Sequence, residues 1–326
     1  MSERLHRDHR NNASRVRKLF GDELRQVGRG QWQLMEGARP GLPRDLPVAS
    51  LTQAHLVSLK GARLSEGVSF ATINREMALV QSPIGYANSL NVLTPEPPLV
   101  WSYGRNRAAS LKLPERNGKL RWLTMREESQ LLASLADRAQ QRSGDQVAAD
   151  AYMLTMFLLD TGGRYSEVAG LRWSQVDLQA GTVSLYRSKV GNESLLRLPL
   201  RTLTALRHRQ EAMRGAGYSY IFPKLTGGSW AGVDLPRGHA TDAIQTQINR
   251  CGLNANPRED KVTPHTFRDT YAARLVQAGV SLLKVSNLLG HASVFMTQKY
   301  AHLCPEAAGA EAAAVLDRLH SLETPA

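Results

Sequence analysis

The chain has 326 residues, and its 41 Lys and Arg outnumber its 29 Asp and Glu, which gives a formal net charge of +12. Hydrophobic residues make up 42% of the chain, so it can bury real cores, and at about 100–200 residues per domain its length predicts two domains. The charged start of the chain lacks a signal-peptide core, and no stretch approaches the ~18 consecutive apolar residues of a membrane helix, so we expect neither a secreted nor a membrane protein.

The positive excess predicts an anionic polymer as partner, most simply nucleic acid, with solubility alone as the alternative explanation. Residues 1–118 carry 17 basic and 10 acidic side chains, and residues 119–326 carry 24 and 19, so both parts of the chain are basic. The two cysteines, Cys251 and Cys304, form no CxxC pair. Their number favours a reduced, intracellular protein.

A small helical domain is predicted for residues 1–112, followed by a linker at 113–118 that contains proline and glycine. Apolar residues four positions apart indicate its first helix, and the Gly- and Pro-rich residues 30–48 are expected to be loop. No strand pattern is convincing here, so we expect an all-α domain. Its helices are expected over residues 14–27, 52–60 (ending at Gly61), 69–79 and 82–91, the last being a fourth helix or a continuation of the third.

A larger, mainly helical domain with a small β-hairpin is predicted for residues 119–326. Thr124 and Glu127 form a capping box at the start of its first helix, and the apolar run 147–159 predicts a buried central helix. Two strand patterns around Gly191 predict the hairpin. The strands are expected over 182–186 and 194–200. Further helices are expected over 201–214, 240–251, 265–278, 281–289, 293–302 and 306–320.

The common motifs for metal and nucleotide binding do not occur in the sequence. There is no HExxH, CxxC or EF-hand spacing, and no Gly-rich phosphate loop. The acidic residues are scattered, which argues against a nuclease with two metal ions. We therefore expect no metal and no cofactor, and a basic protein of this kind needs its own nucleophile and cations to act on a phosphodiester.

Such side chains occur in a fixed order in the second domain, each close to an expected helix end. A Gly-Gly pair precedes the first of them, and another glycine precedes the second histidine. The order is Arg164, with Glu167 three residues later, then His265 and Arg268 on one helix face, His291, and Tyr300 nine residues after it.

This ordered set resembles that of the tyrosine recombinases of the phage integrase family, in which Arg, Lys, His-x-x-Arg, His or Trp, and Tyr follow one another. The resemblance covers most of the chain, is weaker over residues 72–88, and adds Lys189 as the lysine, with Arg187 as the fallback. It implies a mainly α fold with a small antiparallel hairpin (α+β). The resemblance further implies two domains: an all-α, SAM-like core-binding domain at 1–112 and a tyrosine-recombinase catalytic domain at 119–326. The two domains would close around a DNA duplex.

The resemblance also implies site-specific DNA recombination through a covalent 3′-phosphotyrosine, without metal or ATP. Arg164 and Arg268 would hold the non-bridging phosphate oxygens and stabilise the charge that develops there. Tyr300 would be the nucleophile. Because the pKa of an ordinary tyrosine is about 10, the cationic pocket would also have to favour the phenolate.

Four further side chains receive supporting roles from the resemblance. His265 would take the tyrosine proton or position the phosphate, and His291 would hydrogen-bond the phosphate. Lys189 would protonate the leaving 5′ oxygen, and Glu167 would orient its neighbours. Contacts with DNA are expected from Thr72, Asn74, Arg75 and Arg187. For the first three, the alternative that they simply form a solvated helix end is equally open.

The expected partner is double-stranded DNA with short, partly symmetric sites, bound by a tetramer in the cytoplasm with the nucleoid. A C-terminal helix over 306–320 is expected to dock on a neighbouring protomer, and accessory DNA-bending proteins are further expected partners. Residues 1–30 are expected to be too short and too helical for an extra domain that binds arm sites. Two alternatives stay open: a relaxase similar to type IB topoisomerases, and a DNA-binding regulator with a vestigial active site.

Overall fold

The computed structural model describes residues 9–28, 31–92, 97, 99–101, 110–115, 120–142, 145–187, 191–224, 234–238, 241–256, 259–304 and 313–319. The chain separates into two compact units, Met1–Asn117 and Gly118–Ala326. Each unit has hydrophobic cores of its own. Within the described part of the chain, no helix is both long and apolar enough to cross a membrane.

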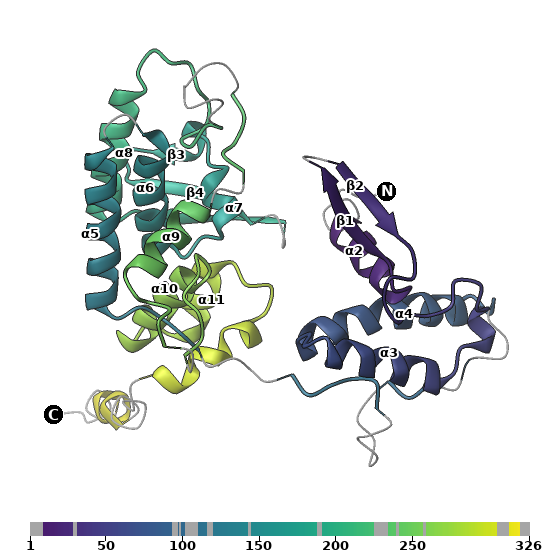
Figure 1. Cartoon of the computed structure of the whole chain (residues 1–326). Coiled ribbons are helices and arrows are strands. Elements are labelled where there is room, and N and C mark those ends of the chain that lie inside the picture. Colours follow the sequence, from purple (N-terminus) through teal and green to yellow (C-terminus); the bar gives the residue numbers. More distant parts are fainter. Residues whose placement is uncertain are drawn as a thin grey trace. The chain divides into compact units, whose positions relative to one another are not determined.

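The N-terminal unit is built on two helices, α3 (Gln53–Ser65) and α4 (Phe70–Ser89), with α2 (His9–Leu19) packed against α4 (Figure 1). Thr52 starts α3 with a capping box, and a short 3-10 turn, η1 (Val48–Ser50), precedes it. The helix runs past Gly61, so its expected end there is wrong. The stretch expected over 82–91 continues the helix expected over 69–79, so that alternative is confirmed, and Pro83 lies inside the single helix.

The expectation of an all-α domain is wrong at residues 23–35, where β1 (Glu23–Gly28) and β2 (Gln31–Met35) form an antiparallel hairpin. The helix expected over 14–27 ends at Leu19. Gly21 then adopts a left-handed conformation with φ of 75°, and a Cβ atom there would lie 2.0 Å from the Arg39 carbonyl oxygen. Only glycine fits this turn, which redirects the chain into the hairpin.

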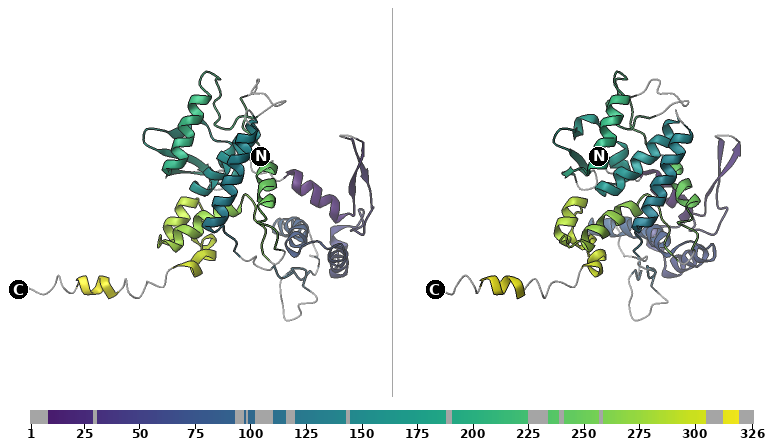
Figure 2. Two further views of the ribbon diagram at one scale, coloured as in Figure 1. Left: turned by 60° about the vertical axis from the view of Figure 1, so that its left-hand side comes forward. Right: turned by 90° about the vertical axis from the view of Figure 1, so that its left-hand side faces the viewer.

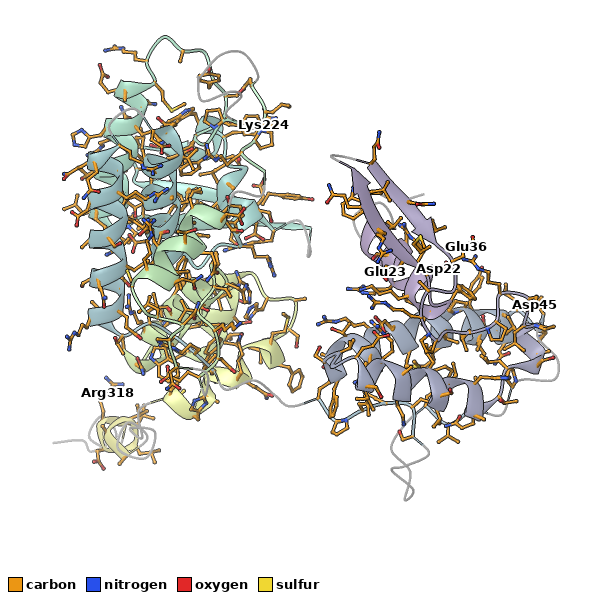
Figure 3. The ribbon with its side chains drawn as sticks, viewed as in Figure 1. Asp22, Glu23, Glu36, Asp45, Lys224 and Arg318 are labelled. Atoms are coloured by element: carbon orange, nitrogen blue, oxygen red, sulfur yellow. The ribbon has the colours of Figure 1, made fainter. Side chains whose placement is uncertain are left out.

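Carboxylates at the base of this hairpin bind the segment that follows it (Figure 3). The Gly37 amide donates to Asp22 Oδ1 at 3.1 Å, and Arg44 forms an ion pair with the same carboxylate. Arg39 forms an ion pair with Glu23, with 2.8 Å between Nη2 and Oε1. These contacts fix where the hairpin leaves the helical part of the unit.

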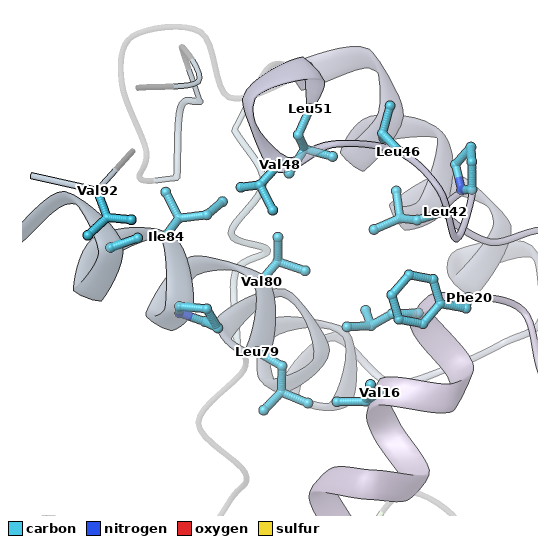
Figure 4. A pocket seen from close by; sticks show the side chains of 14 residues that line it. Val16, Phe20, Leu42, Leu46, Val48, Leu51, Leu79, Val80, Ile84 and Val92 are labelled. Carbon is cyan, nitrogen blue, oxygen red and sulfur yellow. The ribbon is translucent and has the colours of Figure 1, made fainter. Parts of the chain in front are cut away.

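A pocket of about 530 Å³ lies between α2, residues 42–51 and α4 (Figure 4). Its lining is entirely apolar and includes Val16, Phe20, Leu42, Val80 and Ile84. A pocket without a charged or polar side chain offers nothing that binds or cleaves a phosphodiester. It is therefore a packing feature of the N-terminal unit and not the candidate active site.

The C-terminal unit surrounds the buried helix α6 (Gln146–Thr161), which lies beside α5 (Met125–Gln141) in Figures 1 and 2. The capping box of Thr124 and Glu127 begins α5, as predicted. Eleven of the 16 residues of α6 are buried, which agrees with the prediction of a central helix. Three further helices pack against it: α8 (Leu200–Ala212), α9 (Asp242–Arg250) and α10 (Thr266–Gln277).

A three-stranded antiparallel sheet in the order β3-β4-β5 lies in the same unit. The predicted hairpin is confirmed as β4 (Thr182–Arg187) and β5 (Asn192–Arg197), with Leu185 opposite Ser194. The short strand β3 (Val176–Asp177) and the 3-10 turn before it, η2 (Trp173–Gln175), were not predicted.

The end of the unit carries α11 (Leu282–Leu289), η3 (Val294–Met296) and η4 (Gln298–Leu303). The stretch 293–302, predicted as one helix, consists of two 3-10 helices, the first capped by the Ser293 hydroxyl. Of the helix expected over 306–320, residues 313–319 are helical, and the rest lies outside the described residues.

Candidate active site

A glycine turn at the end of α6 places Arg164. Gly162 ends the helix with φ of 60°, and a Cβ atom there would lie 2.5 Å from Cδ1 of Tyr271 and 2.9 Å from Cδ2 of Leu289. No larger residue fits without moving these two side chains. Because of this turn, Arg164 is the N-cap residue of the short helix α7 (Tyr165–Ala169).

Glu167 in α7 binds two arginines at once. Its Oε1 lies 2.6 Å from Arg164 Nη1, and its Oε2 lies 2.7 Å from Arg187 Nη1. Burial of the carboxyl alone would raise the pKa of Glu167, but the hydrogen bonds from Arg164 and the charge of Arg187 outweigh it and hold the pKa below its ordinary value. The ionised carboxylate therefore orients the Arg164 guanidinium.

Arg187, at the end of β4, has no solvent exposure. Besides Glu167 it donates to the Leu288 carbonyl at 2.7 Å and to Ser194 Oγ at 3.2 Å. A buried guanidinium with these partners holds the site together, and its predicted contact with DNA stays a prediction. Lys189, predicted as the general acid, lies outside the described residues.

Arg268 connects the ends of two helices. It lies in the first turn of α10, is 4% exposed, and donates to the Gly162 carbonyl at 2.7 Å and to the Leu289 carbonyl at 2.8 Å. Burial, together with the charges of Arg164 and Arg187, lowers the pKa of Arg268 to about 10. The guanidinium thus stays protonated at neutral pH and is fixed before any ligand binds.

The two predicted histidines lie close enough to Arg164 and Arg268 for these charges to affect them. His291 follows Gly290 at the end of α11, and its Nδ1 lies 2.7 Å from Thr297 Oγ1. Burial, then the charges of Arg268 and Arg164, lowers the pKa of His291 to about 4. Burial also lowers the pKa of His265, which precedes α10; nearby cations add to this effect and Asp269 opposes it. Both imidazoles are therefore neutral at pH 7.

Tyr300 in η4 is 1% exposed and packs with apolar residues of α10 and α11. Its hydroxyl donates to Asp269 Oδ1 at 2.5 Å, and Lys299 Nζ lies 2.6 Å from the same oxygen. Three residues that contact the predicted site residues were not predicted from the sequence: Asp269, Lys299 and Thr297. Asp269 directly follows Arg268, but no spacing in the sequence connects it with a tyrosine 31 positions away.

The structure thus brings five of the six predicted catalytic residues together. The charges of Arg164 and Arg268 act on both histidines, and the charge of Arg268 also reaches Tyr300. No cluster of metal-ligating side chains occurs among the residues that the structure describes. Two guanidiniums, two neutral imidazoles and a phenol form a set that can bind a phosphodiester and attack it. The five residues are Arg164, His265, Arg268, His291 and Tyr300.

The predicted DNA contacts of the N-terminal unit lie in the first turns of α4. The Asn74 side chain exchanges two hydrogen bonds with the backbone of Leu113, at 2.8 and 2.9 Å, so it secures the chain that leaves this unit. The Thr72 hydroxyl lies 2.9 Å from that of Ser69 at the helix start. Arg75 is exposed. Contacts of these residues with DNA stay predictions.

Comparison with known proteins gives matches over both units. The model of the phage integrase family matches residues 121–306. Tyrosine recombinase XerC of Xanthomonas axonopodis pv. citri (strain 306) is 24% identical over 255 residues, which are 78% of this chain and 75% of that protein. Tyrosine recombinase XerD of Mycobacterium tuberculosis (strain CDC 1551 / Oshkosh) is 36% identical over 149 residues, 44% of each chain.

Solved structures extend the likeness to the fold. The crystal structure of a lambda integrase(75-356) dimer bound to a COC' core site matches with a TM-score of 0.62 and 17% sequence identity. The match covers 92% of this chain and 89% of that one. At this level of identity the match supports the mainly helical architecture with its small antiparallel sheets.

Proposed function

The chain belongs to the phage integrase family and is a tyrosine recombinase, and from this premise we propose that it cuts and rejoins DNA at specific sites through a covalent bond between Tyr300 and a 3′ phosphate. The observation that carries the proposal is the fixed position of Arg268. Its guanidinium is tied to the carbonyls of Gly162 and Leu289, close to the turns that carry Arg164 and His291.

The phosphate would be bound by the two catalytic arginines. Arg164 has a partly exposed side chain (18%) whose Nη1 is held by Glu167, and Arg268 lies deeper. As the phosphorus is attacked, negative charge grows on its non-bridging oxygens, and fixed guanidiniums stabilise that charge without reorganising. The neutral imidazole of His291 would add a hydrogen bond to one of these oxygens.

In the proposed reaction the Tyr300 oxygen attacks the phosphorus while the bond from phosphorus to the 5′ oxygen breaks. His265 would take the phenol proton, and Lys189 would give a proton to the leaving 5′ oxygen. A 5′-hydroxyl then attacks the phosphotyrosine in the reverse sense and restores the phosphodiester. One phosphate ester replaces another in each step, so no ATP is consumed.

A nicked suicide substrate tests this proposal. The short piece of DNA after the cut diffuses away, so the phosphotyrosine accumulates and is seen on a denaturing gel. Tyr300→Phe should bind DNA and form no adduct. Tyr271→Phe is the matched control, because Tyr271 is a partly buried tyrosine that packs against the same apolar cluster, and it should form the adduct. An adduct with Tyr300→Phe would disprove the assignment of the nucleophile.

Recombination and simple relaxation differ in whether strands are exchanged between two sites. We propose a tetramer on two short, partly symmetric sites, working with the DNA of the nucleoid in the cytoplasm and with accessory DNA-bending proteins. A plasmid with two copies of the site should yield deletion or inversion products. Relaxed plasmid without such products would instead support a relaxase.

We further propose that the C-terminal helix docks on a neighbouring protomer. Within 313–319, Val315, Leu316 and Leu319 are 43–53% exposed, which leaves an apolar stripe for a partner. Removal of residues 305–326 should weaken assembly on DNA in a mobility-shift assay while the monomer still binds. Unchanged assembly and recombination would contradict the docking.

A further inference from the structure

Asp269 has no role in the proposed reaction. It lies in the first turn of α10, directly after Arg268, and its side chain is 15% exposed. Its Oδ1 accepts the hydroxyl proton of Tyr300 at 2.5 Å and pairs with Lys299 Nζ at 2.6 Å. The phenol of Tyr300 therefore points at a carboxylate in the DNA-free protein.

The charged groups that face the Tyr300 hydroxyl come from two elements. From α10 these are Asp269 and Arg268, and from η4 it is Lys299. The residues of α11 that pack on the ring, Val285 and Leu289, are apolar, and η3 has no titratable residue. Among the residues described, Asp269 is thus the one anion in contact with this hydroxyl.

A carboxylate that accepts a hydrogen bond from a phenol stabilises the neutral phenol and repels the phenolate. Burial and then Asp269 raise the pKa of Tyr300 above its ordinary value, and Arg268 only partly opposes this. A tyrosine that acts as a nucleophile instead needs a lowered pKa. The hydrogen bond between Tyr300 and Asp269 therefore belongs to a resting state of the site. Lys299 weakens the effect of Asp269 on the pKa of Tyr300, because it partly neutralises the carboxylate.

We infer that Asp269 restrains the nucleophile: it holds the Tyr300 hydroxyl as a protonated hydrogen-bond donor until a bound phosphate draws that hydroxyl away. No covalent bond changes in this step, and the proton stays on Tyr300 until the attack. Asp269 is thereby a positioning residue that opposes premature cleavage. The inference rests on the proposed function, since it requires Tyr300 to be the nucleophile.

The substitution Asp269→Asn tests the inference, because asparagine keeps an accepting oxygen and loses the charge. A fluorinated tyrosine at position 300 of the full chain brings the ionisation into an accessible pH range, and its pKa is read by ¹⁹F NMR without DNA. We expect Asp269→Asn to lower this pKa by about 1–3. Cleavage of the nicked substrate at neutral pH should become about tenfold faster.

Two variants serve as controls. Asp242→Asn removes a carboxylate from the first turn of α9 in the same way, and it should change neither the pKa nor the cleavage rate. Lys299→Met removes the partner that neutralises Asp269, so it should raise the pKa and slow cleavage. If circular dichroism shows that Asp269→Asn does not fold, the pKa in Lys299→Met decides: a rise supports the inference and an unchanged value overturns it.

Slower cleavage by Asp269→Asn would overturn the inference, because it would make Asp269 the base that takes the phenol proton. An unchanged pKa in that variant would overturn it as well. The ionisation is measured without DNA and does not depend on catalysis. An adduct with Tyr300→Phe would instead refute the proposed function, so the two failures are distinguishable.

Discussion

Two arginines of the candidate site in the C-terminal unit, Arg187 and Arg268, are buried and bonded to the protein, whereas most of the described arginines and lysines of the N-terminal unit lie at the surface. Arg187 is 0% and Arg268 is 4% exposed. In contrast, Lys18, Arg25 and Arg75 are exposed. Burying a cation is costly unless every donor finds a partner, so we expect the two buried arginines of the candidate site and the exposed cations of the N-terminal unit to have different tasks.

A buried, bonded guanidinium has a fixed position and acts over a short range on one phosphate. Exposed cations attract a polyanion over a distance set by the salt concentration. Neutralising a cation of the candidate site should therefore lower turnover, and neutralising one in the N-terminal unit should lower affinity. Substitutions in both units test this division.

Arg268→Lys keeps the charge but cannot donate to the Gly162 and Leu289 carbonyls and to a phosphate in the same geometry. We expect the single-turnover cleavage rate of the nicked substrate, at saturating protein, to fall by about 10²- to 10³-fold. DNA affinity should change by less than threefold in a mobility-shift assay, as a rough bound. Loss of affinity with unchanged cleavage at saturation would mean that Arg268 serves binding and not turnover.

Glu167→Gln removes the charge that Arg164 and Arg187 share. Because it leaves buried cations without their anion, the free energy of unfolding should fall by about 3 kcal/mol in chemical denaturation. The control is Glu211→Gln, whose ion pair with Arg214 is exposed on both sides (73% and 80%) and should contribute little. Equal effects of the two substitutions would show that Glu167 does not organise the site.

Arg75→Gln removes an exposed cation from α4. Affinity for DNA should fall a few-fold, and the slope of log Kd against log salt should become shallower by about one, as for a single phosphate contact. Cleavage at saturating protein should stay at the rate of the unaltered chain. An unchanged salt dependence would mean that Arg75 makes no phosphate contact.

His291 offers the mildest test of the cationic surrounding. Its pKa of about 4 lies below the ordinary 6.5, so the folded protein binds the proton less readily than the unfolded chain. The resulting stabilisation is complete above pH 6.5 and is lost as the pH falls toward 4. An NMR titration of the imidazole should show a midpoint near 4. A midpoint near 6.5 would mean that neither burial nor the charges of Arg268 and Arg164 act on the imidazole.

Local patterns could be predicted from the sequence where neighbouring residues decide them. Thr124 and Glu127 cap a helix through contacts three residues apart, and Gly290 ends α11 with a left-handed turn. The N-terminal hairpin could not be predicted, because Leu24 continues the helical spacing. The turn at Gly21 depends on a contact with Arg39, which lies on the far side of the hairpin.

The same distinction holds in the candidate site. The ordered residues Arg164, His265 and Tyr300 could be found because the family arranges them along the chain in a fixed order. Their supporting contacts could not. The burial of Arg187 depends on the Leu288 carbonyl, and the partner of Tyr300 is a carboxylate on another helix. Contacts of this kind arise from tertiary packing and leave no spacing in the sequence.

Mass spectrometry of the adduct trapped on a suicide substrate identifies the nucleophile and the linkage. After digestion with nuclease and protease, we expect a nucleotide linked through its 3′ phosphate to Tyr300. A nucleotide on any other residue, or linkage through a 5′ phosphate, would contradict this expectation.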